Sequence, residues 1–161
     1  MVKKQKQPRI PRYTQHTTDI ENAVADAMSE LSGLGEELRS WYDNMPENFQ
    51  NGDKGSMVDE AANTLESLNE VEVPACLSTV PVAYQSDRKA QSRSARCGEA
   101  VNMLNIAKDN AQAFLDENLP EDETKDTETQ ATQREEIDSF ISELDEVISE
   151  AEGVEFPGMF G

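Results

Sequence analysis

Few residues of this chain have the type and spacing that catalysis or metal binding requires. The only histidine, His16, lies in a basic N-terminal stretch, and the two cysteines, Cys76 and Cys97, stand far apart without a second Cys or His beside either one. Structural zinc sites need such ligands in closely spaced pairs. The glycines of GDKGS (52–56) follow no strand and lack the spacing of a phosphate-binding loop. We therefore expect no enzyme activity, no metal and no cofactor, with Cys97 a small buried residue and His16 in a solvated arm.

One cluster of bases stands out in an acidic chain. Arg88, Lys89, Arg93 and Arg96 fall within nine residues, in the first turns of a helix that we expect to begin near 86–87, where the helix dipole disfavours cations. Lys89, Arg93 and Arg96 share one helical face because their spacing is i, i+4, i+7. Two interpretations remain open: ion pairs with neighbouring acidic helices, or binding of a phosphate group or an RNA segment by these four residues.

The C-terminal stretch GVEFPGMFG (153–161) is almost uncharged although the sequence before it is rich in acids. Phe156, Met159 and Phe160 are candidate partner-binding residues, because exposed aromatic and methionine side chains beside proline suit an aromatic-lined groove on another protein. The alternative is a structural cap, in which the same side chains fold over the open end of a helical hairpin.

The charge distribution limits the classes of partner. The formal net charge is −19, with 33 acids and 14 bases, and five of the bases lie in residues 1–13, where there is no acid. An acidic body repels nucleic acid and anionic membranes and attracts basic protein surfaces. The acidity has three interpretations: solubility or a salt-rich cytoplasm, a ligand for a basic protein surface, or imitation of DNA phosphates. The basic arm is the one segment that we expect to touch nucleic acid or an acidic neighbouring subunit, or else it only solubilises the chain.

Apolar periodicity predicts four amphipathic helices and no strand. The clearest pattern alternates steps of four and three residues and ends before Pro46: Ile20, Val24, Ala27, Leu31, Leu34, Leu38, Trp41 and Met45. This is a heptad seam. Weaker stripes predict a second helix from about Ser56, a third that ends at Pro120, and a fourth around Ile137 to Ile148. We expect an all-α fold in which the helices form two antiparallel helical hairpins, as a bundle or a coiled-coil-like pair.

The expected organisation has five parts. They are a flexible basic arm (1–17), a first hairpin (18–72), a proline-containing connector (73–86), a second hairpin (87–152) that contains an acidic linker (118–133), and the apolar C-terminal segment (153–161). Thr18 and Glu21 have the spacing of a capping box at the start of the first helix. The stretches WYDNMPEN (41–48) and FLDENLPED (114–122) end the first and third helices alike, which indicates either a duplicated hairpin or chance similarity.

The stretch 38–68 resembles a segment of small acidic helical accessory proteins of bacteriophages and mobile elements. Its helix ends in Trp41, Asp43-Asn44 and Pro46-Glu47-Asn48, and a second amphipathic helix follows. The resemblance covers about thirty residues and transfers no functional residue. It implies a phage accessory protein, either a virion component or an inhibitor directed at the host.

The leading expectation is a non-enzymatic acidic interaction protein, a host-directed inhibitor or adaptor, that binds a protein with a basic or aromatic-lined surface. The alternatives are a structural virion or assembly component held by its terminal segments, and a DNA mimic that inhibits a nucleic-acid-binding enzyme. Self-association into a homo-oligomer stays open. We expect no membrane contact, because no apolar run reaches the length of a membrane span, and a location in the host cytoplasm or the virion.

Overall fold

The computed structural model describes residues 13–87, 91–119 and 127–157. The chain is mostly helical, which confirms the predicted helical class, and it also contains a small two-stranded sheet. The elements in chain order are β1 (Tyr13–Asp19), α1 (Ile20–Asn44), α2 (Glu47–Gln50), α3 (Asp53–Glu66), the 3-10 turn η1 (Ala75–Leu77), β2 (Pro81–Asp87), α4 (Arg93–Asn118) and α5 (Glu128–Glu152).

The predicted heptad seam is the buried face of α1. Six of its eight positions are almost fully buried: Ile20, Val24, Ala27, Leu31, Leu34 and Leu38. The last two, Trp41 and Met45, are partly buried and pack against the same core. The helix begins one residue later than the capping-box prediction, because Asp19 is the N-cap and its carboxylate accepts a hydrogen bond of 2.8 Å from the Asn22 backbone N–H.

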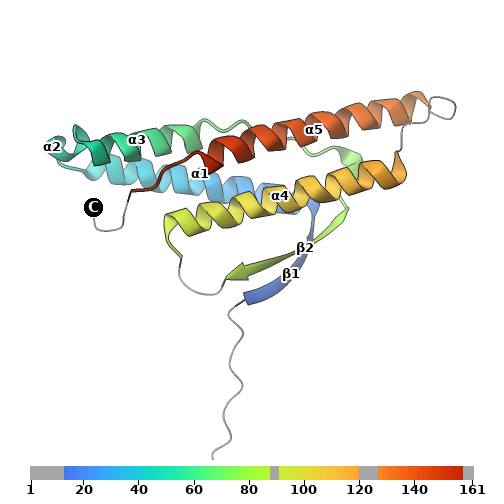
Figure 1. Cartoon of the computed structure of the whole chain (residues 1–161), viewed down its shortest axis with the longest axis horizontal. Coiled ribbons are helices and arrows are strands. Elements are labelled where there is room, and N and C mark those ends of the chain that lie inside the picture. Colours follow the sequence, from blue (N-terminus) through green and yellow to red (C-terminus); the bar gives the residue numbers. More distant parts are fainter. Residues whose placement is uncertain (1–12, 88–90, 120–126, 158–161) are drawn as a thin grey trace, which may run out of the picture.

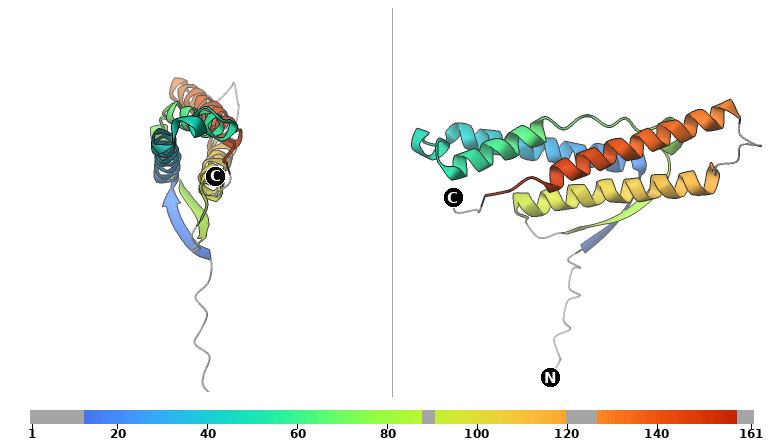
Figure 2. Two further views of the ribbon diagram at one scale, coloured as in Figure 1. Left: turned by 90° about the vertical axis from the view of Figure 1, so that its left-hand side faces the viewer. Right: turned by 45° about the horizontal axis from the view of Figure 1, so that its top comes forward.

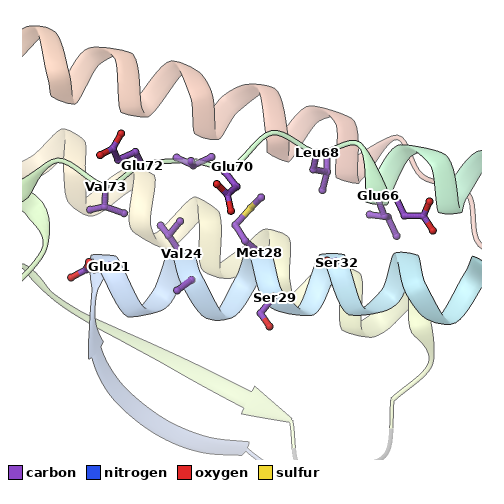
Figure 3. Close-up of a pocket in the computed structure, with 13 residues that line it drawn as sticks. Glu21, Val24, Met28, Ser29, Ser32, Glu66, Leu68, Glu70, Glu72 and Val73 are labelled. Carbon is purple, nitrogen blue, oxygen red and sulfur yellow. The ribbon is translucent and has the colours of Figure 1, made fainter.

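Helix α1 is the centre of the packing. It lies between α3 and α4, and α5 packs mainly against α4 (Figures 1 and 2). Figure 1 shows that α1 runs antiparallel to both of these neighbours, and that α5 runs antiparallel to α4. Gly35 permits the close approach of α1 and α3, since a Cβ there would lie 3.1 Å from the Leu65 Cβ. The two outer helices, α3 and α5, hardly touch each other, and the extended chain that follows α3 runs along the side of the molecule between α1 and α5 (Figures 1 and 3).

Strands β1 and β2 form an antiparallel ribbon on the other side of the molecule, below the α1–α4 pair in Figure 2. The register pairs Tyr13 with Asp87 and Asp19 with Pro81. The prediction of a strand-free arm (1–17) and a strand-free connector (73–86) is therefore wrong for residues 13–17 and 81–86. Threonine, valine and tyrosine favour extended backbone, but the pairing joins segments more than sixty residues apart and no local pattern reveals it.

Residue His16 belongs to this ribbon and not to a solvated arm. Its ring stacks on Tyr84 with the ring centres 4.9 Å apart, and its Nε2 lies 2.7 Å from the Ser86 Oγ. Both contacts cross from β1 to β2. The histidine therefore has a structural role in holding the two strands together.

Besides the start of α1, four helix boundaries differ from the prediction. Helix α3 begins at Asp53, three residues before the expected start at about Ser56. Helix α3 ends at Glu66, and residues 69–74 are extended, because LNEVEVP alternates apolar and charged residues up to a proline. Helix α4 begins at Arg93 after the N-cap Ser92, and not near 86–87, because those residues belong to β2. Helix α5 begins at Glu128, inside the expected linker 118–133, because Thr127 and Gln130 form a capping box.

The core of the described residues contains no buried polar or charged side chain. Cys97 is 4 % exposed, as predicted for a small core residue, and burial raises the pKa of its thiol. None of the described helices combines the length and apolar character that crossing a membrane requires.

Candidate functional site

A groove of about 860 Å³ lies between α1 and residues 68–73, and we call it the main groove (Figure 3). Its apolar floor consists of Val24, Met28, Leu65, Leu68, Val71 and Val73. Its acidic rim consists of Glu21, Glu66, Glu70 and Glu72, all exposed. Figure 3 shows Met28 pointing from α1 toward the extended segment, beside the carboxylate of Glu70.

Two smaller hollows lie on the other side of the extended segment, against α5. One has a volume of about 540 Å³ and is lined by Glu135, Glu136 and Glu143 of α5, and the other has a volume of about 210 Å³ and is lined by Glu143, Glu146 and Glu150. Glu72 and Val73 also line the first of them, and Glu70 and Val71 the second, so all three hollows adjoin the same short stretch of chain. No Lys or Arg is among the described residues that line them.

The extended segment leaves its backbone open. Within the described part of the chain, residues 69–73 make no backbone hydrogen bond, whereas Ser67 N–H bonds to the Asn63 carbonyl before the segment and Leu77 N–H to the Pro74 carbonyl after it. Unpaired N–H and C=O groups on extended chain are a template for a further strand. The groove therefore offers an apolar floor, carboxylates and backbone hydrogen-bonding groups in one place.

Several bases of the described chain form ion pairs inside the fold. Each of three packed helix pairs has an ion pair across it: Arg39 to Asp59 at 2.7 Å between α1 and α3, Arg96 to Glu30 at 2.6 Å and to Glu37 at 2.7 Å between α1 and α4, and Lys108 to Asp145 at 2.8 Å between α4 and α5. Hydrogen bonding by Arg96 lowers the pKa of Glu37, and the two glutamates raise the pKa of Arg96. Arg39 Nε also lies 3.4 Å from a carboxylate oxygen of Glu66, on the rim of the groove. Most acids of the described residues take part in none of these ion pairs.

Helix α4 contains two of the four residues of the candidate basic cluster. Arg93 and Arg96 lie in the first turn of α4, where Arg96 forms the pairs described above and Arg93 Nε lies 3.7 Å from Glu37. The Arg93 guanidinium also lies over the Trp41 ring, 5.2 Å from its centre. Arg88 and Lys89 lie outside the described residues. The described half of the cluster thus contacts α1, as in the ion-pair interpretation.

Of the candidate residues at the C-terminus, only Phe156 is described. It is partly buried and packs against the core together with Val154. Met159 and Phe160 lie outside the described residues. The contact of Phe156 is the one expected of a cap, and the role of the last four residues stays a prediction.

The main groove was not predicted from the sequence. Leu68 and Val71 were assigned to the second helix, and the connector was expected only from Val73 onward. The signal was present in the alternation Glu70-Val71-Glu72-Val73, because a period of two is typical of extended chain. The acids of the rim are spread over α1, α3 and the segment, so only the folded chain brings them together.

Comparisons with known proteins give no match: no family model, no curated protein and no solved structure corresponds to this chain. Within the described ranges, no group of three or more His, Cys, Asp or Glu side chains is arranged to hold a metal ion.

Proposed function

We propose that this chain is a non-enzymatic interaction protein that binds a cationic, partly apolar segment of another protein in the main groove. The observation that carries the proposal is the combination of an apolar floor with a rim of exposed glutamates and no described base. Complementary charge gives such a contact its specificity and a fast association rate. Apolar side chains of the ligand would cover the floor, and its Lys or Arg side chains would meet the rim.

The internal ion pairs support this proposal. Because Arg39, Arg96 and Lys108 are each paired across two helices, the surplus of acids faces outward and is available to a partner. We further propose, from the resemblance of residues 38–68, that the protein belongs to a phage or mobile-element programme as a host-directed inhibitor or adaptor, in the host cytoplasm or the virion. In this proposal the α1–α3 and α4–α5 pairs act as two antiparallel helical hairpins that present the groove.

The test uses a defined probe, a labelled synthetic peptide of alternating lysine and valine, titrated against the full chain at low salt. The variant Glu70→Gln/Glu72→Gln should weaken binding by about threefold to thirtyfold, because it removes two exposed charges of the rim, each worth at most about 1 kcal/mol. The matched control Glu36→Gln/Asp43→Asn removes two exposed acids of α1 that do not line the groove and should bind like the unchanged protein.

A further variant, Val71→Ser, separates groove binding from DNA mimicry. It makes the floor more polar without altering charge, so binding in the groove should weaken. If the groove double variant and the control lose affinity equally, and Val71→Ser loses none, charge alone attracts the peptide. That result would reject the groove and favour the DNA mimic.

A further inference from the structure

The chain itself contains a segment with the chemistry that the main groove accepts. Residues 1–12 include five bases (Lys3, Lys4, Lys6, Arg9 and Arg12), the apolar residues Val2 and Ile10, and no acid. The groove has four glutamates on its rim, an apolar floor and no Lys or Arg among its described lining residues. The inference below rests on the proposed function, because it names an occupant for the same groove.

The lengths of the two parts are compatible. The groove follows α1 from Glu21 to Ser32, which at 1.5 Å per helical residue is about 17 Å. Five extended residues span about 17 Å, and twelve span about 40 Å. A segment of twelve residues therefore fills the groove with about half of its length, and about 23 Å remains to reach it.

The attachment point of the segment favours a groove on another molecule. Residue 13 begins β1 at the end of the ribbon where Tyr13 pairs with Asp87. Figures 1 and 2 show the ribbon on one side of the α1–α4 pair, and the extended chain after α3 on the other. A segment that starts at Tyr13 would have to pass around the helices to enter its own groove, whereas the groove of a neighbouring molecule can be reached without that detour.

We propose that residues 1–12 of one copy bind in the main groove of a second copy, extended beside residues 69–73. The open backbone of residues 69–73 provides hydrogen-bonding groups for an added strand. The bases of the incoming segment meet Glu21, Glu70 and Glu72, while Glu66 already lies 3.4 Å from Arg39 Nε. Because the two contacting surfaces differ, this contact is heterologous and generates rings or open chains of copies.

The test measures self-association of the full chain by sedimentation velocity between 1 and 100 µM, at 50 mM and 500 mM NaCl. We expect oligomers at low salt and at least a tenfold weaker association at high salt, because exposed charges are screened. A variant with all five bases of residues 1–12 changed to Gln, and separately Glu70→Gln/Glu72→Gln, should each be monomeric across this range. The control Glu36→Gln/Asp43→Asn should associate like the unchanged chain. A monomeric unchanged chain at 100 µM and 50 mM NaCl overturns the proposal.

A second measurement identifies the contact and its direction. Unlabelled and ¹⁵N-labelled chains are mixed and treated with a carbodiimide, which joins lysine amines to carboxylates in contact. Crosslinks from Lys3, Lys4 or Lys6 to Glu70 or Glu72 that combine one labelled and one unlabelled peptide support the proposal. The same crosslinks formed only within one isotope show that the segment folds onto its own groove, and would overturn it.

Failure of this inference is distinguishable from failure of the proposed function. A synthetic peptide of residues 1–12 and the lysine–valine peptide are titrated side by side. Binding of the lysine–valine peptide without binding of peptide 1–12 overturns the inference and leaves the proposed function intact. Failure of both peptides rejects the groove as a site for cationic segments, and with it both proposals.

Discussion

Arg96 is the side chain whose role in the fold is most directly testable. In the variant Arg96→Met, the hydrogen bond from Nε to Glu30 (2.6 Å) and the two bonds from the guanidinium to Glu37 (2.7 and 3.1 Å) are lost. The three side chains are between 31 and 41 % exposed, so solvent screens each pair and limits its contribution to at most about 1 kcal/mol. The variant should therefore lose about 1–2 kcal/mol of unfolding free energy, or about 2–8 °C in melting temperature.

The loss should depend on pH in a defined direction. Arg96 lowers the pKa of Glu37 below its ordinary value, so this pair stabilises the folded chain above the ordinary pKa of glutamate and stops doing so as the pH falls through the lowered pKa. The difference between the unchanged chain and Arg96→Met should be complete at pH 7, begin to shrink near pH 5 and be smaller still at pH 3. Urea unfolding followed by circular dichroism at these three pH values measures it.

A double-mutant cycle separates the ion pair from other consequences of the substitution. Arg96→Met and Glu37→Gln should couple by about 0.5–1 kcal/mol at low salt, whereas Arg96→Met and Glu36→Gln should be additive, because Glu36 has no described contact with Arg96. Additive effects with Glu37, together with no loss of stability in the single variant, would refute the reasoning. Arg96 would then be free for a partner and would return to the list of candidate binding residues.

Three further predictions concern packing. Gly55→Ala should lower the unfolding free energy by several kcal/mol, because its Cβ would collide with backbone carbonyl oxygens of α2. Gly33→Ala should raise the unfolding free energy by about 0.5–1 kcal/mol, because its Cβ would meet nothing within 4 Å. Equal effects of the two variants in urea unfolding would contradict this prediction. Deletion of residues 156–161 should lower the unfolding free energy by about 1–2 kcal/mol, because Phe156 is partly buried against the core, and an unchanged melting temperature would exclude the cap. Cys76, which is partly exposed, should react with a thiol reagent much faster than buried Cys97, as peptide mapping of the modified chain would show; equal rates would contradict the burial of Cys97.

The sequence was informative where the chain folds locally. The heptad seam of α1 identified its buried face, because side chains three or four residues apart lie on the same side of a helix. Pro46 identified the end of this helix. The ribbon was missed because its polar strands have little apolar alternation, and because their pairing depends on chain that is distant in sequence. The start of α4 was placed too early for the same reason, since residues 86 and 87 pair with β1 instead of continuing into the helix.

The candidate site was predictable only in part. The excess of acid follows from composition, and the expectation of a basic partner was drawn from it. The groove does not, because it exists only where the extended chain after Glu66 lies beside α1. The sequence allowed two interpretations of Arg93 and Arg96, ion pairs within the fold or binding of a phosphate group or RNA segment. The choice between them depended on whether acids of α1 lie close enough to form ion pairs with these arginines. Glu30 and Glu37 are one heptad apart, so they lie on one side of α1 and both reach Arg96.

The pairing of β1 with β2 also determines the order in which the chain can fold during synthesis. Strand β1 is made first, but its partner residues begin at Pro81, about sixty residues later. At the usual synthesis rates of 5–20 residues per second, β1 waits about 3–12 s for its partner. Helices α1 and α3 lie between the two strands in sequence and can pair during that interval. The ribbon can therefore close only after both helices have been made, and the Ile20 N–H is bonded to the Val80 carbonyl at 3.0 Å where the strands meet α1.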